Sequence, residues 1–118
     1  MSDSIVEKIN IAQDFTRYPG ARYVSDGDNS GEKFYIIMLK AKFEGVFNSD
    51  NKKLEINFDG TYGYASSFIS EVFRRLVFDY KDKQKILSKL ILTTNDDPLL
   101  KEAILSVINE TNETKSSD

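Results

Sequence analysis

Apolar and polar residues alternate in several short segments of the chain, which is the pattern of a β-strand with one buried face. Residues 54–58 read LEINF, in which every second side chain is apolar. Residues 5–12 carry isoleucines two positions apart among polar neighbours, and residues 89–94 read KLILTT. Residues 21–24 form a shorter apolar run after a Tyr-Pro-Gly turn. We therefore predict about four strands, of which the first two pair as an antiparallel, hairpin-like unit.

Three longer segments repeat apolar residues at intervals of three and four, which is the spacing of an amphipathic helix. They cover residues 32–45, 68–80 and 98–108. Ser30 is placed to cap the first of these helices. Asp97, followed directly by a proline, is a strong start signal for the third.

The order of these elements is strand, strand, helix, strand, helix, strand, helix. Strands separated by helices need right-handed crossovers, which favours a largely parallel sheet. We therefore expect one small α/β domain over residues 1–108, with a mixed, mostly parallel sheet of about four strands and about three helices. In this scheme residues 81–85 are a solvated link, and residues 109–118 form a polar C-terminal tail.

The composition limits the chemistry that the chain can perform. A chain of 118 residues, with 40% apolar and 30% charged residues, has the size and balance of one soluble globular domain. It contains neither cysteine nor histidine, which removes thiolate catalysis, the commonest general base and the commonest zinc ligand. We therefore expect a protein that is not an enzyme and that has no cofactor and no metal.

Charge and hydropathy narrow the choice of partner. The net charge of -3 is mild and lacks the basic field of a dedicated nucleic-acid binder, so no nucleic-acid partner is expected. No apolar run approaches the length that spans a bilayer, and the first residues do not have the pattern of a secretion signal. We expect a cytoplasmic protein with no membrane partner.

Two loops hold residue types that often bind ligands. Residues 26–31 (DGDNSG) begin like a calcium loop, but the twelfth position, which should supply a carboxylate, is Ile37. Asp59 and residues 95–97 are both expected beyond the carboxyl ends of strands, where α/β proteins bind ligands. Paired carboxylates there would suit magnesium. Alternatively, Asp59 shapes a turn and Asp97 caps a helix.

Residues 59–76 (DGTYGYASSFISEVFRRL) pass from an acidic turn through small residues into a helix. Ser66 and Ser67 stand where that helix begins, so either serine can serve as its N-cap. Gly60 and Gly63 keep the approach to the helix clear of bulky side chains, which suits close contact with a partner or a ligand phosphate. A phosphate on a serine here would meet free N–H groups and the positive end of the helix dipole.

The run LEINFDGTYGYASSFISEVFRRL is similar to the strand, turn and serine-led helix of STAS domains, which occur in sulfate transporters and anti-sigma factor antagonists. Together with DFTRYPGARYVSDGDNSGEKF, it resembles more closely the STAS-like domains of unknown function that occur as small bacterial proteins. This second resemblance covers roughly residues 9–94. It implies a fold with the element order given above and a bacterial regulatory module that works by partner switching.

The resemblance also implies a partner and a modification. In anti-sigma factor antagonists, a partner kinase with a histidine-kinase-like ATPase fold phosphorylates the first of two serines, which here is Ser66, with Ser67 beside it. This chain departs from that pattern at two positions. Ala65 replaces the Asp that precedes the first serine, and Phe68 replaces the Gly that follows the second.

Two hypotheses for function follow. The preferred one is a non-enzymatic regulatory module that docks a partner ATPase or kinase through the serine-led helix start. The alternative is a domain that binds a small ligand, such as a nucleotide, at the carboxyl ends of the strands. Both hypotheses draw on the same predicted site, which consists of Asp59, Gly60, Tyr62, Gly63, Ser66, Ser67 and Asn95.

Overall fold

Three parallel strands form the sheet of this protein, and the computed structural model describes residues 5–112. The strands lie in the order β1–β2–β3, so the central strand β2 pairs with both neighbours. In the register, Ile9 of β1 lies beside Ile56 of β2, which in turn lies beside Leu92 of β3. The strands are β1 (Ile5–Asn10), β2 (Lys52–Asn57) and β3 (Leu90–Thr93).

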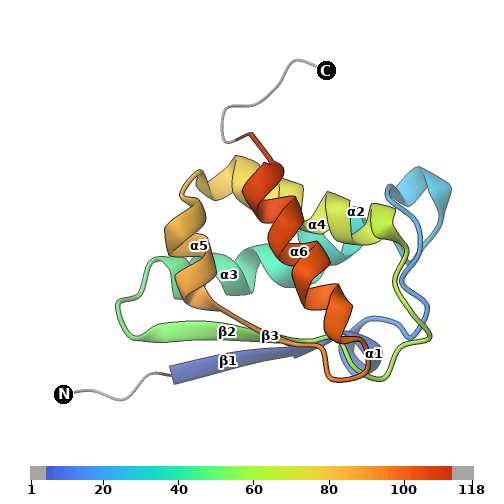
Figure 1. The fold of residues 1–118 in the computed structure, drawn as a ribbon, viewed down its shortest axis with the longest axis horizontal. Helices are drawn as coiled ribbons and strands as arrows, with labels where there is room; N and C mark the ends of the chain where they lie inside the picture. The colour runs from blue at the N-terminus through green and yellow to red at the C-terminus, as the bar shows by residue number, and fades with distance from the viewer. Residues whose placement is uncertain (1–4, 113–118) are drawn as a thin grey trace.

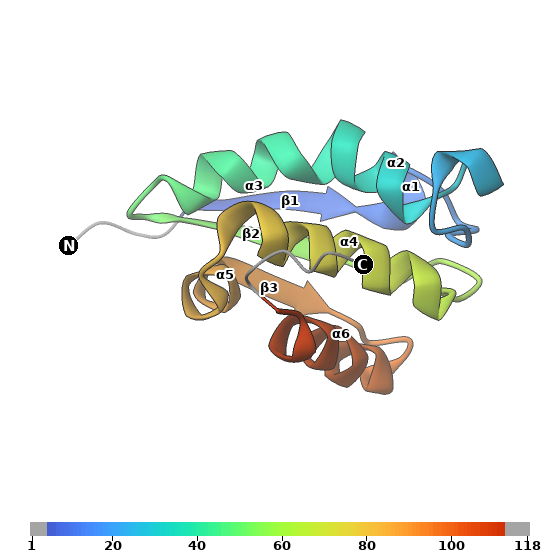
Figure 2. The ribbon, with the colours of Figure 1, turned by 90° about the horizontal axis from the view of Figure 1, so that it is seen from above.

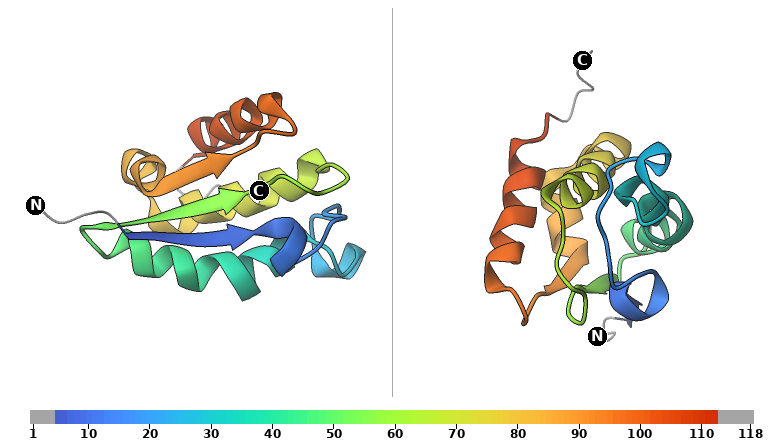
Figure 3. Two further views of the ribbon diagram at one scale, coloured as in Figure 1. Left: turned by 90° about the horizontal axis from the view of Figure 1, so that it is seen from below. Right: turned by 90° about the vertical axis from the view of Figure 1, so that its right-hand side faces the viewer.

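Helices connect the strands and cover one face of the sheet (Figures 1 and 2). Seen from below, the strands lie in front and the helices behind them (Figure 3). The strand order explains this arrangement, because right-handed crossovers that always advance in the same direction place their helices on the same side. The helical elements are α1 (Ile11–Asp14), the 3-10 helix η1 (Val24–Asp26), α2 (Gly31–Phe34), the π-helix η2 (Tyr35–Leu39), α3 (Lys40–Phe47), α4 (Ser66–Tyr80), α5 (Lys83–Lys89) and α6 (Pro98–Glu110).

The α/β class and most of the predicted elements are confirmed. The strands predicted at residues 54–58 and 89–94 are present, and α2, η2 and α3 follow one another where one long helix was expected. Of the predicted tail at residues 109–118, helix α6 includes the first two residues, and residues 113–118 lie outside the described part of the chain. No helix within residues 5–112 has the length and apolarity needed to cross a bilayer.

The predicted strand at residues 21–24, and with it the antiparallel edge of the sheet, is wrong. This segment bends around the start of α2 and leads into η1. Its carbonyl groups are already used, because Ala21 accepts a hydrogen bond from the N–H of Gly31 (2.9 Å) and Arg22 accepts one from the N–H of Glu32 (3.0 Å). The backbone of this segment therefore satisfies the first turn of a helix and is not available for a strand.

Residues 81–85 are largely exposed, as predicted, but they do not form a simple link, because helix α5 begins there. Lys81 ends α4 in the left-handed conformation, with a φ of 58°. Asp82 then caps α5, since its Oδ1 accepts a hydrogen bond from the N–H of Lys85 at 3.1 Å. Ile86 of α5 is fully buried, which adds tertiary packing to a segment whose sequence is mostly charged.

The strands bury one face of the sheet and leave the other exposed and mostly polar, as their alternating sequences predict. Leu54 and Ile56 of β2 are fully buried under the helices. Glu55 and Asn57 alternate with them and so lie on the opposite face, where the Thr93 hydroxyl donates a hydrogen bond to Glu55 Oε2 (2.5 Å). Parallel sheets usually carry helices on both faces. Here the second face stays exposed and mostly polar, with Val6 and Ile91 as apolar exceptions, and the domain has two layers.

Helix α2 crosses α4 at a contact that only glycine permits. A Cβ atom placed on Gly31 would lie 2.7 Å from the carbonyl oxygen of Phe68, which is shorter than real Cβ contacts. Beside this crossing, Glu71 of α4 is 7% exposed. It forms ion pairs with Arg75 of its own helix and with Arg22 of the loop that precedes α2. A close backbone contact and a buried carboxylate with two cationic partners thus hold α2 and its loop against α4.

The crossing predicts that Gly31→Ala will lower the free energy of unfolding by about 1–3 kcal/mol, since the added methyl group meets a backbone atom that has little room to move. Gly45→Ala in α3 is the matched control. No atom lies within 4 Å of its added Cβ, so the control should gain about 0.5–1 kcal/mol from helix propensity. Urea unfolding measures both values, and equal stability of the Gly31→Ala protein and the wild type would contradict the close crossing.

Candidate functional site

The loop after β2 and the loop after β3 hold each other at the carboxyl end of the sheet. Oδ1 of Asp59 accepts a hydrogen bond from the N–H of Asp96 at 2.8 Å, and Oδ2 of Asp96 accepts one from the N–H of Gly60 at 2.9 Å. We call this reciprocal pair the loop latch. Asn57 Oδ1 accepts from the N–H of Asp59 and so starts the turn, in which Gly60 has a φ of 92°. The latch makes one continuous surface of two loops that are far apart in sequence.

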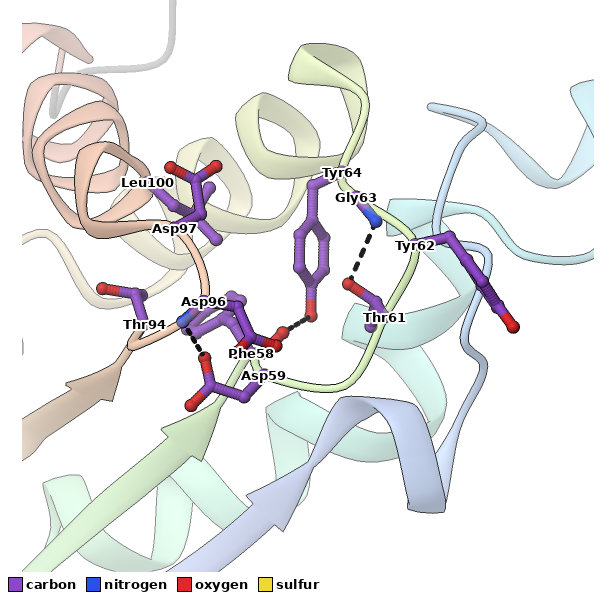
Figure 4. A pocket seen from close by; sticks show the side chains of 10 residues that line it. All are labelled: Phe58, Asp59, Thr61, Tyr62, Gly63, Tyr64, Thr94, Asp96, Asp97 and Leu100. Carbon is purple, nitrogen blue, oxygen red and sulfur yellow. Dashed lines mark hydrogen bonds between the residues drawn. The ribbon is translucent and has the colours of Figure 1, made fainter.

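A hollow of about 230 Å³ lies between these loops, and we call it the acidic hollow (Figure 4). Its charged residues are Asp59, Asp96 and Asp97, and none of the described residues that line it is basic. Tyr62 and Tyr64 contribute aromatic rings. The other lining residues are Phe58, Thr61, Gly63, Thr94 and Leu100.

Tyr64 connects the acidic hollow to the core. Its hydroxyl donates a hydrogen bond to the carbonyl oxygen of Phe58 at 2.8 Å (Figure 4), and its ring meets the ring of Phe58 edge-on at a centroid distance of 5.5 Å. Burial is the main cause that raises the pKa of the Tyr64 phenol above its ordinary value. Thr61 lowers this pKa through a hydrogen bond, and the negative charges of Asp59 and Asp96 raise it by smaller amounts. Tyr64 therefore stays protonated and acts as a hydrogen-bond donor at neutral pH.

Tyr18 and Tyr62 form an exposed aromatic pair at the rim of the hollow. Their rings stack with centroids 4.9 Å apart and planes inclined by 11°, although the two residues are 63% and 74% exposed. The backbone is braced at the same place, because the N–H of Tyr62 donates to the carbonyl of Arg17 (2.9 Å) and the N–H of Ala65 donates to that of Pro19 (3.5 Å). The loop after α1 thus supports the loop that leads into α4.

The prediction that Ser66 or Ser67 caps α4 is wrong. The N-cap is Ala65, which makes no side-chain capping bond, so the serines occupy the first two helical positions. Ala65 is extended just before the helix, and its N–H group donates to the carbonyl of Pro19, so the loop after α1 lies against the start of α4. Ser67 Oγ donates to the carbonyl oxygen of Gly20 at 3.3 Å, whereas Ser66 is exposed.

Ser66 borders a second hollow of about 290 Å³ between α4 and α6, which we call the apolar groove. Ile69 and Leu100 form its buried side, at 3% and 8% exposure. Leu99 stands at its edge and is 71% exposed. The other lining residues are Tyr64, Asp97, Ala103 and Val107.

Some of the predicted site residues line these two hollows and some do not. Asp59, Tyr62 and Gly63 line the acidic hollow, and Ser66 lines the apolar groove. Gly60 takes part in the loop latch, and Ser67 bonds to the neighbouring loop. Asn95 is exposed and lines neither hollow.

Several lining residues were not predicted from the sequence as site residues, and Tyr64, Leu99 and Leu100 are among them. A signal for Leu99 was present, because it is an apolar residue outside the buried stripe of its amphipathic helix. Leu100 belongs to that stripe, so its pattern indicated only a core position. Tyr64 lies in an irregular loop, where no periodicity shows which way a side chain points.

The structure adds no support for the metal-binding alternatives. Within residues 5–112 no three carboxylate, histidine or cysteine side chains gather in a way that could hold a metal ion. The carboxylates of Asp59 and Asp96 each accept a backbone N–H, which fits the alternative role in a turn. In the loop that begins like a calcium site, Ser30 Oγ accepts from the N–H of Lys33 at 3.0 Å and caps α2 as predicted. Asp97 occupies the N-cap position of α6 but makes no side-chain capping bond.

The fold and these loops define a small two-layer α/β domain in which two adjoining hollows lie where the loops after β2 and β3 lead into α4 and α6. A sequence profile of the STAS-like domain of unknown function (DUF4325) matches residues 30–100, which is more than half of the chain. The chain therefore belongs to this STAS-like family, as its sequence indicated. Comparisons with curated proteins and with solved structures found no match.

Tyr64→Phe should lower the free energy of unfolding by about 1 kcal/mol at neutral pH, since the hydrogen bond to the Phe58 carbonyl is lost. The raised pKa of Tyr64 means that this contribution is complete below the ordinary tyrosine value of 10.0 and is lost as the pH rises beyond it. The variant should therefore lose less stability than the wild type in alkaline solution.

Urea unfolding at a series of pH values tests this prediction. Tyr62→Phe is the matched control, because Tyr62 is 74% exposed and its substitution should change the free energy of unfolding by less than about 0.5 kcal/mol. Identical pH profiles for Tyr64→Phe and the wild type would show that the Tyr64 phenol does not titrate with unfolding.

Proposed function

We propose that this chain is a non-enzymatic interaction module that docks a partner protein at the carboxyl end of its sheet. The docking surface consists of the acidic hollow, the apolar groove and the Tyr18–Tyr62 pair. The observation that carries the proposal is that the three most exposed large apolar side chains within residues 5–112 belong to this surface, namely Tyr62 at 74%, Leu99 at 71% and Tyr18 at 63%. Exposed aromatic and aliphatic residues beside a concave surface are typical of protein-binding sites.

The rigidity of the surface supports the same proposal. The loop latch joins the loops after β2 and β3, and the N–H groups of Tyr62 and Ala65 bond to the loop after α1. A surface that is ordered before binding loses less conformational entropy when a partner docks. This arrangement therefore favours recognition of a protein surface by a prearranged shape.

We further propose that phosphorylation of Ser66 regulates docking and that the partner is a kinase or ATPase of the histidine-kinase-like kind. The resemblance to anti-sigma factor antagonists suggests this partner, and the exposure of Ser66 is compatible with modification. Ser66 and Asp97 line the same groove. A phosphate at Ser66 would add almost two negative charges there, so the partner would meet a changed field.

The surface gives less support to the alternative, nucleotide binding. The described residues that line the acidic hollow include three carboxylates and no cation, so a phosphate group would be repelled there. The strand order β1–β2–β3 also has no point where the direction of the crossovers reverses. In open α/β sheets, ligands bind in the crevice that such a reversal creates.

Ser66→Glu should weaken partner capture about tenfold relative to the wild type, because the new carboxylate lies in the apolar groove and would lose its water when a partner's apolar side chain fills that groove. The experiment immobilises the purified chain, passes lysate from the native cell over it and identifies the bound proteins by mass spectrometry. Ser66→Ala and Ser106→Glu are the controls, since the first adds no charge and the second adds one at an exposed position of α6. Equal capture on all four proteins, or capture of no protein, would contradict the proposal.

A thermal-shift measurement tests the nucleotide alternative. With a panel of nucleotides and magnesium, we expect no change in Tm, because the acidic hollow disfavours phosphate. A saturable rise in Tm for the wild type that disappears in Asp59→Asn would instead favour a ligand-binding domain. Asp28→Asn, an exposed position in another loop, is the control for a nonspecific change of charge.

A further inference from the structure

The acidic hollow and the apolar groove adjoin. Tyr64, Asp97 and Leu100 line both of them, so the two form one continuous depression. The depression is acidic at one end and mainly apolar at the other. Asp97 marks the boundary, where the loop after β3 enters α6 (Figure 4). An occupant that crosses this boundary passes from an acidic wall to an apolar one.

The apolar groove is suited to an aliphatic or aromatic side chain. Ile69 and Leu100 are buried at one side, and Leu99 is 71% exposed at its edge. The side chain of Leu99 would lose most of its contact with water if a partner covered it, which stabilises a complex by the hydrophobic effect. The volume of about 290 Å³ limits the occupant to a small part of a partner.

The acidic hollow is suited to a cation. Oδ1 of Asp59 and Oδ2 of Asp96 accept the hydrogen bonds of the loop latch, which leaves the second oxygen of each carboxylate to face another donor. The side chain of Asp97 makes no capping hydrogen bond to α6. The exposed ring of Tyr62 adds an aromatic face, which also attracts a cation.

We propose that the partner binds through a segment in which a Lys or Arg lies next to an apolar residue. The cationic side chain enters the acidic hollow and the apolar side chain enters the groove, on either side of Asp97. This inference rests on the proposed docking function and adds the chemistry of the partner. It follows from charge complementarity, since an acidic segment would be repelled by the three carboxylates and a wholly apolar one would leave them desolvated and unpaired.

Selection of random peptides displayed on phage, with the purified full-length chain as bait, tests the inference without knowledge of the natural partner. We expect the selected peptides to be enriched in Lys or Arg beside Leu, Ile or Phe. Affinities are then measured by fluorescence anisotropy with synthetic copies of these peptides. Binding should weaken as the salt concentration rises, because part of the attraction is between charges that stay partly in water.

Two substitutions examine the two halves of the depression. Asp97→Asn should raise the Kd about threefold to tenfold by removing one of the three carboxylate charges, and Leu99→Ser should raise it about tenfold by removing the exposed apolar edge. Asp28→Asn and Ile37→Ser are matched controls at exposed positions elsewhere, Ile37 being 58% exposed. The controls should leave the Kd within about twofold.

The inference is overturned if no selected peptide is weakened by both Asp97→Asn and Leu99→Ser, or if the peptides that depend on Leu99 carry no basic residue. The proposed docking function is judged separately by the capture experiment with Ser66→Glu. A partner that depends on Ser66, together with peptides that are indifferent to Asp97, would leave the docking function standing and remove only the basic segment.

Discussion

Burial of the apolar side of β2 is the constraint on which the rest of this structure depends. Leu54 and Ile56 are fully buried under the helices, whereas Glu55, which lies between them, belongs to a polar face. Because only one face of the sheet can be buried, the helices must lie on that face. The three parallel strands then advance in one direction, β1 to β2 to β3, and the long helices run back over them.

This arrangement also determines where a recognition surface can form. Parallel strands that share one helical layer bring the loops after β2 and β3 to the same edge of the sheet, together with the starts of α4 and α6. The loop latch then joins the two loops through Asp59 and Asp96. The acidic hollow and the apolar groove are consequences of this convergence, because each is lined by residues from both loops or from the helices that follow them.

Local sequence patterns predicted the structure correctly where a segment satisfies its own backbone hydrogen bonds, or where its apolar residues repeat with the period of a strand or helix. The LEINF alternation indicated β2, and Ser30 indicated the start of α2, where its hydroxyl oxygen accepts the expected hydrogen bond. Local signals failed where another segment takes the hydrogen-bonding groups. Residues 21–24 have an apolar, strand-like sequence, but their carbonyls bond to the first turn of α2. The serines before Phe68 fit the composition of a cap, yet Ala65 occupies that position and its N–H group donates to the loop after α1.

The sequence by itself determined the α/β class, the one-sided burial of the strands and the family. Each of these follows from local sequence patterns, namely the spacing of apolar residues, the helix-capping residues and the family motifs. It also predicted Asp59 and Tyr62 as site residues, and both line the acidic hollow. Only the tertiary structure decided that Ser66 borders an apolar groove, that Ser67 turns toward Gly20 and that Tyr18 stacks on Tyr62. These features depend on contacts between segments distant in the chain, and no pattern among neighbouring residues indicates such contacts.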